Sequence, residues 1–296
     1  MTHNYRHYLA TTPPYISINW LTKYKDIPRH IISNLISIID RYDDSEDSSK
    51  VSDKKFNRYQ LLDKLERGRP SLVLVIPSRN NEEYVKKNIQ SVAIQKYQNY
   101  RIIYLDDQST DDTVNQVKYY SRLYNLVDRL KLVIMPERNR QGAGRFRAYH
   151  MCDDDEILCM LDGDDWLYDE NTLTRVADQY KKGAMVTYGS YLRFNNGNLE
   201  GFVYGKDETF DTTIIQRQGI RHHRWITQHL RTGYAGLFKR ILYNDLVDRQ
   251  NNFLQVATDI CETMPILEMA YPNIAKISTP TYVYNMDASN RHKSSY

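Results

Sequence analysis

Residues 156–168, EILCMLDGDDWLY, decide how the rest of the chain is interpreted. Their five consecutive apolar residues, 157–161, are too short a run for a typical helix and predict a buried parallel strand. Three carboxylates, Asp162, Asp164 and Asp165, follow within four positions. Like charges repel one another in a partly buried crevice, so this segment predicts a bound cation.

Mg2+ and Mn2+ prefer carboxylate oxygens together with phosphate oxygens, so residues 162–165 are a candidate metal site. Gly163 would let a ligand come close to the backbone. The alternative is a solvated acidic turn, because short Asp-rich turns are common.

Length and composition indicate a globular protein with one large domain and a smaller appendage. The chain has 296 residues, of which 41% are apolar, enough for a sizeable core. Forty basic and 37 acidic residues give a net charge of +3, which does not favour a nucleic-acid partner.

The cysteines and the apolar segments predict a cytoplasmic protein. Cys152, Cys159 and Cys261 form no close pair and no metal-ligand spacing, which favours reduced thiols. The most apolar early segment, residues 31–39, is too short for a transmembrane helix and lacks the layout of a signal peptide.

Residues 1–70 are predicted to form a small helical appendage. Residues 28–42 and 55–67 have apolar side chains at helical spacing, and the segment between them is rich in Asp, Ser and Lys, as linkers are. These helices would either cap the main domain or form an oligomerisation or docking element, through which a homo-oligomer would assemble.

From residue 71 onward, strands alternate with helices, which predicts an α/β fold with a mostly parallel sheet flanked by helices. The predicted strands are 72–76, 102–105, 132–135, 157–161, 185–188 and 282–285. Polar residues follow three of these strands directly, at 78–80, 106–107 and 162–165. Ligands bind at the carboxyl ends of strands in open α/β sheets, so the three segments predict one nucleotide and metal site.

At these positions the chain resembles the family 2 glycosyltransferases, inverting enzymes of the GT-A (Rossmann-like) fold that use nucleotide-sugar donors. The motifs are VIPSRNNE at 75–82, YLDDQSTD at 104–111 and LDGDD at 161–165, and the resemblance covers about 72–284. It implies a nucleotide-sugar-binding half at 71–190, and an acceptor-binding half with a C-terminal segment at 191–296.

The resemblance also implies the donor site. The base and ribose would be held by the loops after the first two strands and by the start of the acidic segment. These residues are Pro77, Ser78, Arg79, Asn80, Asp106, Asp107, Asp162 and Gly163. Arg147, five residues after Gly142, would correspond to the arginine of the family that contacts the donor.

The metal on the diphosphate, Mn2+ or Mg2+, would be bound by Asp164 with Asp162 or Asp165, and His292 would complete its ligand shell. A cation there would stabilise the negative charge of the departing diphosphate. Asp106 or Asp107 would accept a hydrogen bond from the imide N–H of uracil, so we expect a UDP-sugar donor.

Two acidic residues are candidates for the base that deprotonates the acceptor hydroxyl. Asp259 falls where the family carries a catalytic Glu-Asp pair and is the predicted base, although Thr258 replaces the usual acid. Glu262, one helical turn later, is the alternative base. Asp259 would otherwise be an ordinary helix N-cap.

The acceptor side is predicted within RHHRWITQHLRT at 221–232. Trp225 would stack on a sugar, while His229 and Arg231 would contact diphosphate or acceptor hydroxyls. A basic surface turn is the alternative. The acceptor would be a glycan, a protein or a lipid-linked sugar, and two further readings are a phosphoryl-transfer α/β enzyme and an inactive nucleotide-sugar-binding scaffold.

Overall fold

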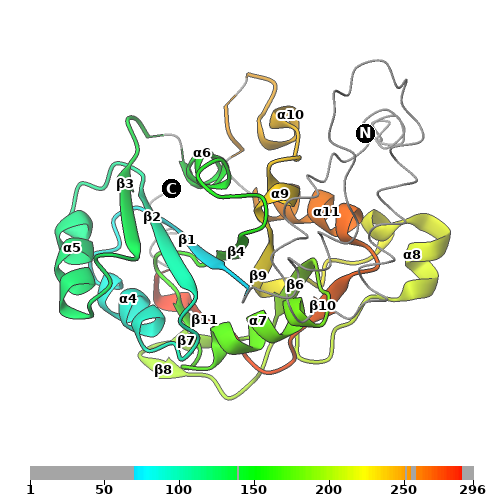
Figure 1. Cartoon of the computed structure of the whole chain (residues 1–296), viewed down its shortest axis with the longest axis horizontal. Helices are drawn as coiled ribbons and strands as arrows, with labels where there is room; N and C mark the ends of the chain where they lie inside the picture. The colour runs from blue at the N-terminus through cyan, green and yellow to red at the C-terminus, as the bar shows by residue number, and fades with distance from the viewer. Residues whose placement is uncertain (1–69, 139, 251, 255–257, 289–296) are drawn as a thin grey trace, which may run out of the picture.

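The computed structural model describes residues 70–138, 140–250, 252–254 and 258–288 (Figure 1). The predicted N-terminal helices and His292 lie outside these residues, so the appendage, its role in oligomerisation and the metal-ligand role of His292 stay predictions. Among the described residues, no helix combines the length and apolar character needed to cross a membrane.

A seven-stranded sheet forms the centre of the fold, in the order β10-β6-β9-β4-β1-β2-β3. Its strands are β1 (Leu72–Ser78), β2 (Tyr100–Asp106), β3 (Leu130–Ile134), β4 (Ile157–Met160), β6 (Val186–Gly189), β9 (Gln228–Tyr234) and β10 (Ile274–Lys276). All neighbours pair in parallel except β9, which is antiparallel to both β4 and β6. The predicted mostly parallel α/β fold is therefore confirmed.

Helices flank this sheet, as the alternating pattern predicts. The longer ones are α4 (Val85–Ala93), α5 (Thr113–Leu123), α6 (Arg140–Tyr149), α7 (Thr172–Lys181) and α11 (Thr258–Ala270). The shorter ones are α8 (Thr212–Gln218), a 3-10 turn (Ile220–His222), α9 (Ala235–Phe238) and α10 (Tyr243–Leu246). α4 and α5 lie side by side near β3, whereas α6 and α11 lie toward the opposite side of the view from α7 (Figure 1).

A second, four-stranded sheet has the order β5-β11-β7-β8. Its strands are β5 (Trp166–Leu167), β11 (Tyr282–Asn285), β7 (Tyr191–Asn195) and β8 (Asn198–Leu199). β11 pairs with β5 and with β7. Because β5 begins directly after residue 165, this small sheet fixes the end of the acidic segment.

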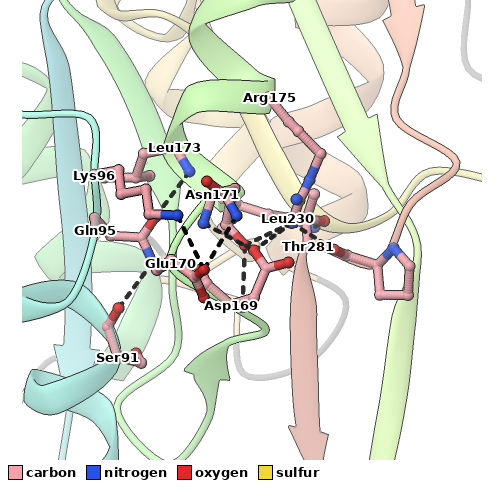
Figure 2. A network of polar contacts seen from close by, with 12 residues as sticks. Ser91, Gln95, Lys96, Asp169, Glu170, Asn171, Leu173, Arg175, Leu230 and Thr281 are labelled. Atoms are coloured by element: carbon pink, nitrogen blue, oxygen red, sulfur yellow. Dashed lines mark hydrogen bonds and ion pairs between the residues drawn. The ribbon is translucent and has the colours of Figure 1, made fainter.

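A buried glutamine holds the chain that follows β5 (Figure 2). Gln95 donates to the carbonyl of Asp169 over 2.6 Å and accepts from the backbone N–H of Leu173 over 2.9 Å. Arg175 pairs with the Asp169 carboxylate at 2.6 Å and donates to the carbonyl of Pro280 at 3.0 Å. These bonds join the chain just after α4, the start of α7 and the segment before β11, and so hold the chain that follows the acidic segment and β5.

Five strands, β5, β7, β8, β9 and β10, are not among those predicted from the sequence, and β9 is the longest of them. Residues 221–232 were expected to be an acceptor segment or a basic turn, yet Gln228–Tyr234 crosses the middle of the main sheet. Its buried positions include polar residues, Arg231 and Thr232 among them. The Thr232 hydroxyl is bonded to those of Tyr180 and Thr187, at 2.8 and 2.7 Å, so hydrogen bonds replace the apolar pattern that marks most buried strands.

Candidate active site

The loops after β1, β2 and β4 meet at the carboxyl edge of the sheet. Gly163 donates its N–H to the carbonyl of Pro77 over 3.0 Å, and Asp107 donates its N–H to the carbonyl of Ser78 over 2.9 Å. The three polar segments that follow separate strands are thus joined through their backbones.

Ser78 packs inside this junction. Its hydroxyl oxygen accepts from the Asn81 amide at 3.0 Å and from the Tyr104 hydroxyl at 2.9 Å, and the residue is buried. A Cβ atom at position 163 would lie 2.6 Å from the Ser78 side chain. The close packing of the loop after β4 against the loop after β1 therefore requires glycine at position 163, whether or not a ligand also approaches the backbone there.

The second loop presents one buried carboxylate and one partly buried one. Asp106 accepts from the N–H of Ser109 at 3.1 Å through Oδ2, while its buried Oδ1 accepts no hydrogen bond from the described residues. Asp107 is partly buried, as is Arg79, and Asn80 is exposed. Asp106 Oδ1 is thus an acceptor that a donor group of a ligand could satisfy.

The carboxylates of the acidic segment, residues 162–165, point in different directions. Asp162 accepts through Oδ1 from Gln141 at 2.7 Å and from Arg145 at 2.6 Å. Asp165 is buried and uses both oxygens, since it accepts from the Tyr282 hydroxyl and from the N–H of Asn285, each at 2.7 Å. Asp165 is therefore a poor metal ligand in this arrangement, contrary to its inclusion among the predicted ligands.

Ionisation is unfavourable at two carboxyl groups of the acidic segment, Asp164 and Asp165. Burial raises the pKa of Asp164 to about 7, and repulsion from Asp162 adds to this effect. Burial also raises the pKa of Asp165, and repulsion from Asp164 and Asp162 raises it further. The cation Arg145 contacts only Asp162 within this segment, so the segment as a whole would gain from a further positive charge.

Among the described residues, no three His, Cys, Asp or Glu side chains converge to hold a metal by themselves. Mg2+ sites often use one or two carboxylates and complete the shell with substrate phosphates and water. The hard oxygen atoms of Asp162 and Asp164 fit a cation of this kind, shared with a bound diphosphate.

The arginine at the site is Arg145 rather than Arg147. Arg147 is exposed, whereas Arg145 is buried and bonds Asp162 at 2.6 Å and Glu262 at 3.2 Å. Residues two positions apart point to different sides of an α-helix, so only one of the two can face the site from α6. The pKa of Arg145 is lowered by burial but raised further by Glu262 and Asp162, and the side chain stays charged.

The two candidate bases lie in different environments at the start of α11. The Asp259 side chain is 34% exposed and pairs with Arg231 through Oδ2 at 3.2 Å. The Glu262 side chain is 3% exposed and pairs with Arg145. Burial raises the pKa of Glu262, against the opposing effects of Arg145, Tyr149 and Arg231.

Of the three predicted acceptor residues, Arg231 contacts Asp259 directly, and Trp225 and His229 lie near Arg231. Arg231 is buried on β9, and its guanidinium carbon lies 5.9 Å from the ring centre of the partly exposed Trp225. His229 stacks on Tyr282 with ring centres 4.5 Å apart. Burial lowers the pKa of His229 well below its usual range, as do Arg231 and Arg145, so the imidazole is neutral.

Several residues of the site escaped the sequence reading: Gln141, Arg145, Tyr282, Asn285 and Asn88, whose amide donates to the carbonyls of Asp162 and Asp165. Their contacts join positions up to 121 apart in the sequence. The strand containing Tyr282 and Asn285 was predicted, but no local pattern indicated that it supports the acidic segment.

An acidic segment at the carboxyl edge of a mostly parallel sheet, with a buried arginine beside it, is typical of an α/β enzyme whose ligand binds where the strands end. The sequence model described as Glycosyl transferase family 2 matches residues 73–246, and the chain belongs to this family.

Curated relatives agree with this family. The glycosyltransferase GlyA of Streptococcus pneumoniae is 22% identical over 59% of this chain and 25% of its own length. WfgD of Escherichia coli, named as a UDP-Glc:alpha-D-GlcNAc-diphosphoundecaprenol beta-1,3-glucosyltransferase, is 27% identical over 50% of this chain and 56% of its own length. The chain thus spans between a quarter and somewhat more than half of these relatives.

Solved structures share the fold. TarS of S. aureus, residues 1–349, superposes with a TM-score of 0.55 at 21% identity, covering 73% of this chain and 60% of that one. The same protein in complex with UDP-GlcNAc gives a TM-score of 0.53 at 20% identity, covering 73% and 58%. At this identity the likeness establishes the GT-A fold.

Proposed function

We propose that this domain transfers a single sugar from a UDP-sugar to an acceptor hydroxyl, with inversion at the anomeric carbon and with a divalent cation. The observation that carries the proposal is the pair of contacts made by Arg145. It pairs with Asp162, in the acidic segment after β4, and with Glu262, one helical turn from Asp259 at the start of α11.

A uridine donor is supported from two directions. The buried Oδ1 of Asp106 is an acceptor suited to the imide N–H of uracil, which cytosine lacks. Two similar proteins are consistent with this base: WfgD is named for UDP-Glc, and TarS has been crystallised with UDP-GlcNAc. We therefore assign the base to the loop after β2.

The leaving diphosphate would lie over the acidic segment. A Mn2+ or Mg2+ ion held by Asp162 and Asp164 would supply electrophilic stabilisation of the leaving oxygen. Arg145, which stays charged in its buried position, adds fixed positive charge beside Asp162. Such preorganised charge is effective because it needs no rearrangement as the bond breaks.

Asp259 is the proposed base. Its Oδ2 is paired with Arg231, which leaves Oδ1 to take the proton of the acceptor hydroxyl. The acceptor oxygen then bonds to the anomeric carbon while the bond from that carbon to the diphosphate oxygen breaks, and the configuration inverts. Trp225, neutral His229 and Arg231 would position the acceptor, and we place the reaction in the cytoplasm, where the three free cysteines stay reduced.

A donor screen tests this proposal. UDP-, GDP- and CDP-sugars are compared for thermal stabilisation of the protein with and without Mn2+. We expect stabilisation by uridine donors, increased by Mn2+, and then transfer with inverted anomeric configuration by NMR. Preference for a guanosine or cytidine donor, or retention of configuration, would overturn the proposal, and tight binding without hydrolysis or transfer would indicate a binding scaffold.

A further inference from the structure

The first turns of α11 carry two acidic residues, each paired with a buried arginine from a different element. Asp259 pairs with Arg231 of β9, and Glu262 pairs with Arg145 of α6, both at 3.2 Å. The second terminal nitrogen of Arg145 pairs with Asp162 at 2.6 Å. One guanidinium therefore spans the acidic segment and α11.

Stability alone gives a poor reason for this arrangement. The side chains of Arg145 and Glu262 are each 3% exposed. Removing such charges from water is costly, and well-packed apolar residues often serve the fold as well or better. A buried ion pair does, however, fix relative orientation, because breaking it leaves an uncompensated charge.

The contact between α6 and the start of α11 is also close. A Cβ atom at Gly142 would lie 3.5 Å from the Thr258 side chain. Gly142 lies one turn before Arg145 on the same helix. Backbone proximity and the Arg145–Glu262 pair thus hold the same two elements together at the site.

We propose that Arg145 and Glu262 are positioning residues, which set the distance between the donor side at Asp162 and the base Asp259. Glu262 lies one helical turn from Asp259, so fixing Glu262 fixes the turn that carries the base. Displacement of a reacting group by about 1 Å can reduce a rate about a hundredfold. This inference rests on the proposed function and assigns Glu262 a role distinct from that of a base.

The test compares Glu262→Gln with a matched control on the same helix. The control is Glu268, which lies near the other end of α11 from Asp259. It also forms an ion pair with an arginine, but with Arg221, at 2.5 Å, and not with Arg145. We expect Glu262→Gln to lower kcat for transfer about 10- to 100-fold, with donor KM and stabilisation by UDP and Mn2+ within about twofold of the wild type. Glu268→Gln should leave kcat unchanged.

The pH profile separates positioning from base catalysis. The proposed base, Asp259, remains in Glu262→Gln. The decrease of kcat at acidic pH that a carboxylate base causes should therefore persist in this variant. Its loss would make Glu262 the base and overturn the inference. Equal kcat in Glu262→Gln and Glu268→Gln would also overturn it, as would a parallel loss of melting temperature, donor binding and kcat.

A second variant covers the case in which Glu262→Gln does not fold. Glu262→Asp keeps the charge on a side chain one methylene shorter, and we expect an intermediate kcat with normal donor binding. Full activity in Glu262→Asp would show that a negative charge at this position is sufficient and that the length of the side chain does not set the position of Asp259. That result would overturn the inference. Absence of transfer by the wild type with every donor would instead refute the proposed function, and this inference with it.

Discussion

At the scale of single residues, Asp164 shows most clearly the cost of gathering carboxyl groups at this site. Burial and then Asp162 raise its pKa from 3.8 to about 7. A raised pKa means that the folded state binds the proton more tightly than the unfolded chain. This contribution to stability is complete below about pH 4 and is lost as the pH rises through about 7.

Asp164→Asn should therefore stabilise the metal-free protein at pH 8 while abolishing transfer. We expect the free energy of unfolding to rise by about 1–3 kcal/mol at pH 8, with a smaller gain at pH 5. Urea unfolding in EDTA at both pH values measures this difference. Asp162→Asn is the contrasting variant and should destabilise the protein, because it removes the charge that partners buried Arg145. Equal stability of Asp164→Asn and the wild type at pH 8 would contradict the charge argument.

Arg145 and Arg147 provide a second residue-scale comparison. Arg145→Ala should lower kcat/KM about a hundredfold or more, because it removes fixed charge from the site. Arg147→Ala, which truncates an exposed side chain on the same helix, should stay close to the wild type. Steady-state kinetics with a UDP-sugar would show the contrast, and a larger loss in Arg147→Ala would restore the assignment made from the sequence.

At the scale of elements, the buried parallel strands were predictable and the polar ones were not. β1, β2 and β4 contain continuous apolar runs, at 72–76, 102–105 and 157–160, as expected for strands buried on both faces. β9 keeps polar residues buried and was invisible for that reason. The acidic segment was found because its charges are adjacent in sequence, whereas Arg145 and Tyr282 reach it only through the tertiary fold.

Tyr282→Phe tests the link between the small sheet and the acidic segment. The Tyr282 hydroxyl donates to Asp165 at 2.7 Å and accepts from the N–H of Asp162 at 3.1 Å. Removing it leaves buried groups unpaired, so we expect a loss of about 1–3 kcal/mol in unfolding free energy and weaker binding of UDP with Mn2+. Tyr119→Phe, at an exposed position on α5, is the control, and unaltered binding in Tyr282→Phe would argue against this support.

At the scale of the whole molecule, the proposed donor and acceptor halves, residues 71–190 and 191–296, share one sheet. β9 and β10 come from the second half and lie in the same sheet as β1, β2 and β4 from the first. The buried core likewise includes residues of both halves. If these halves bind the donor and the acceptor as proposed, both substrates would be presented to one edge of the sheet.

Removal of divalent cations tests whether a metal ion takes part in donor binding and in transfer. EDTA is expected to abolish transfer and to reduce stabilisation by UDP, because the charges of Asp162 and Asp164 would then face the diphosphate directly. Added Mn2+ should restore both effects. Transfer at an unchanged rate in EDTA would remove the cation from the mechanism.

The most direct test of the account is a crystal structure with UDP and Mn2+, with anomalous data collected to locate the metal. The account predicts a manganese peak beside the carboxylates of Asp162 and Asp164, the diphosphate on that metal, and uracil against the loop that holds Asp106. A manganese ion or diphosphate bound away from the acidic segment would contradict it.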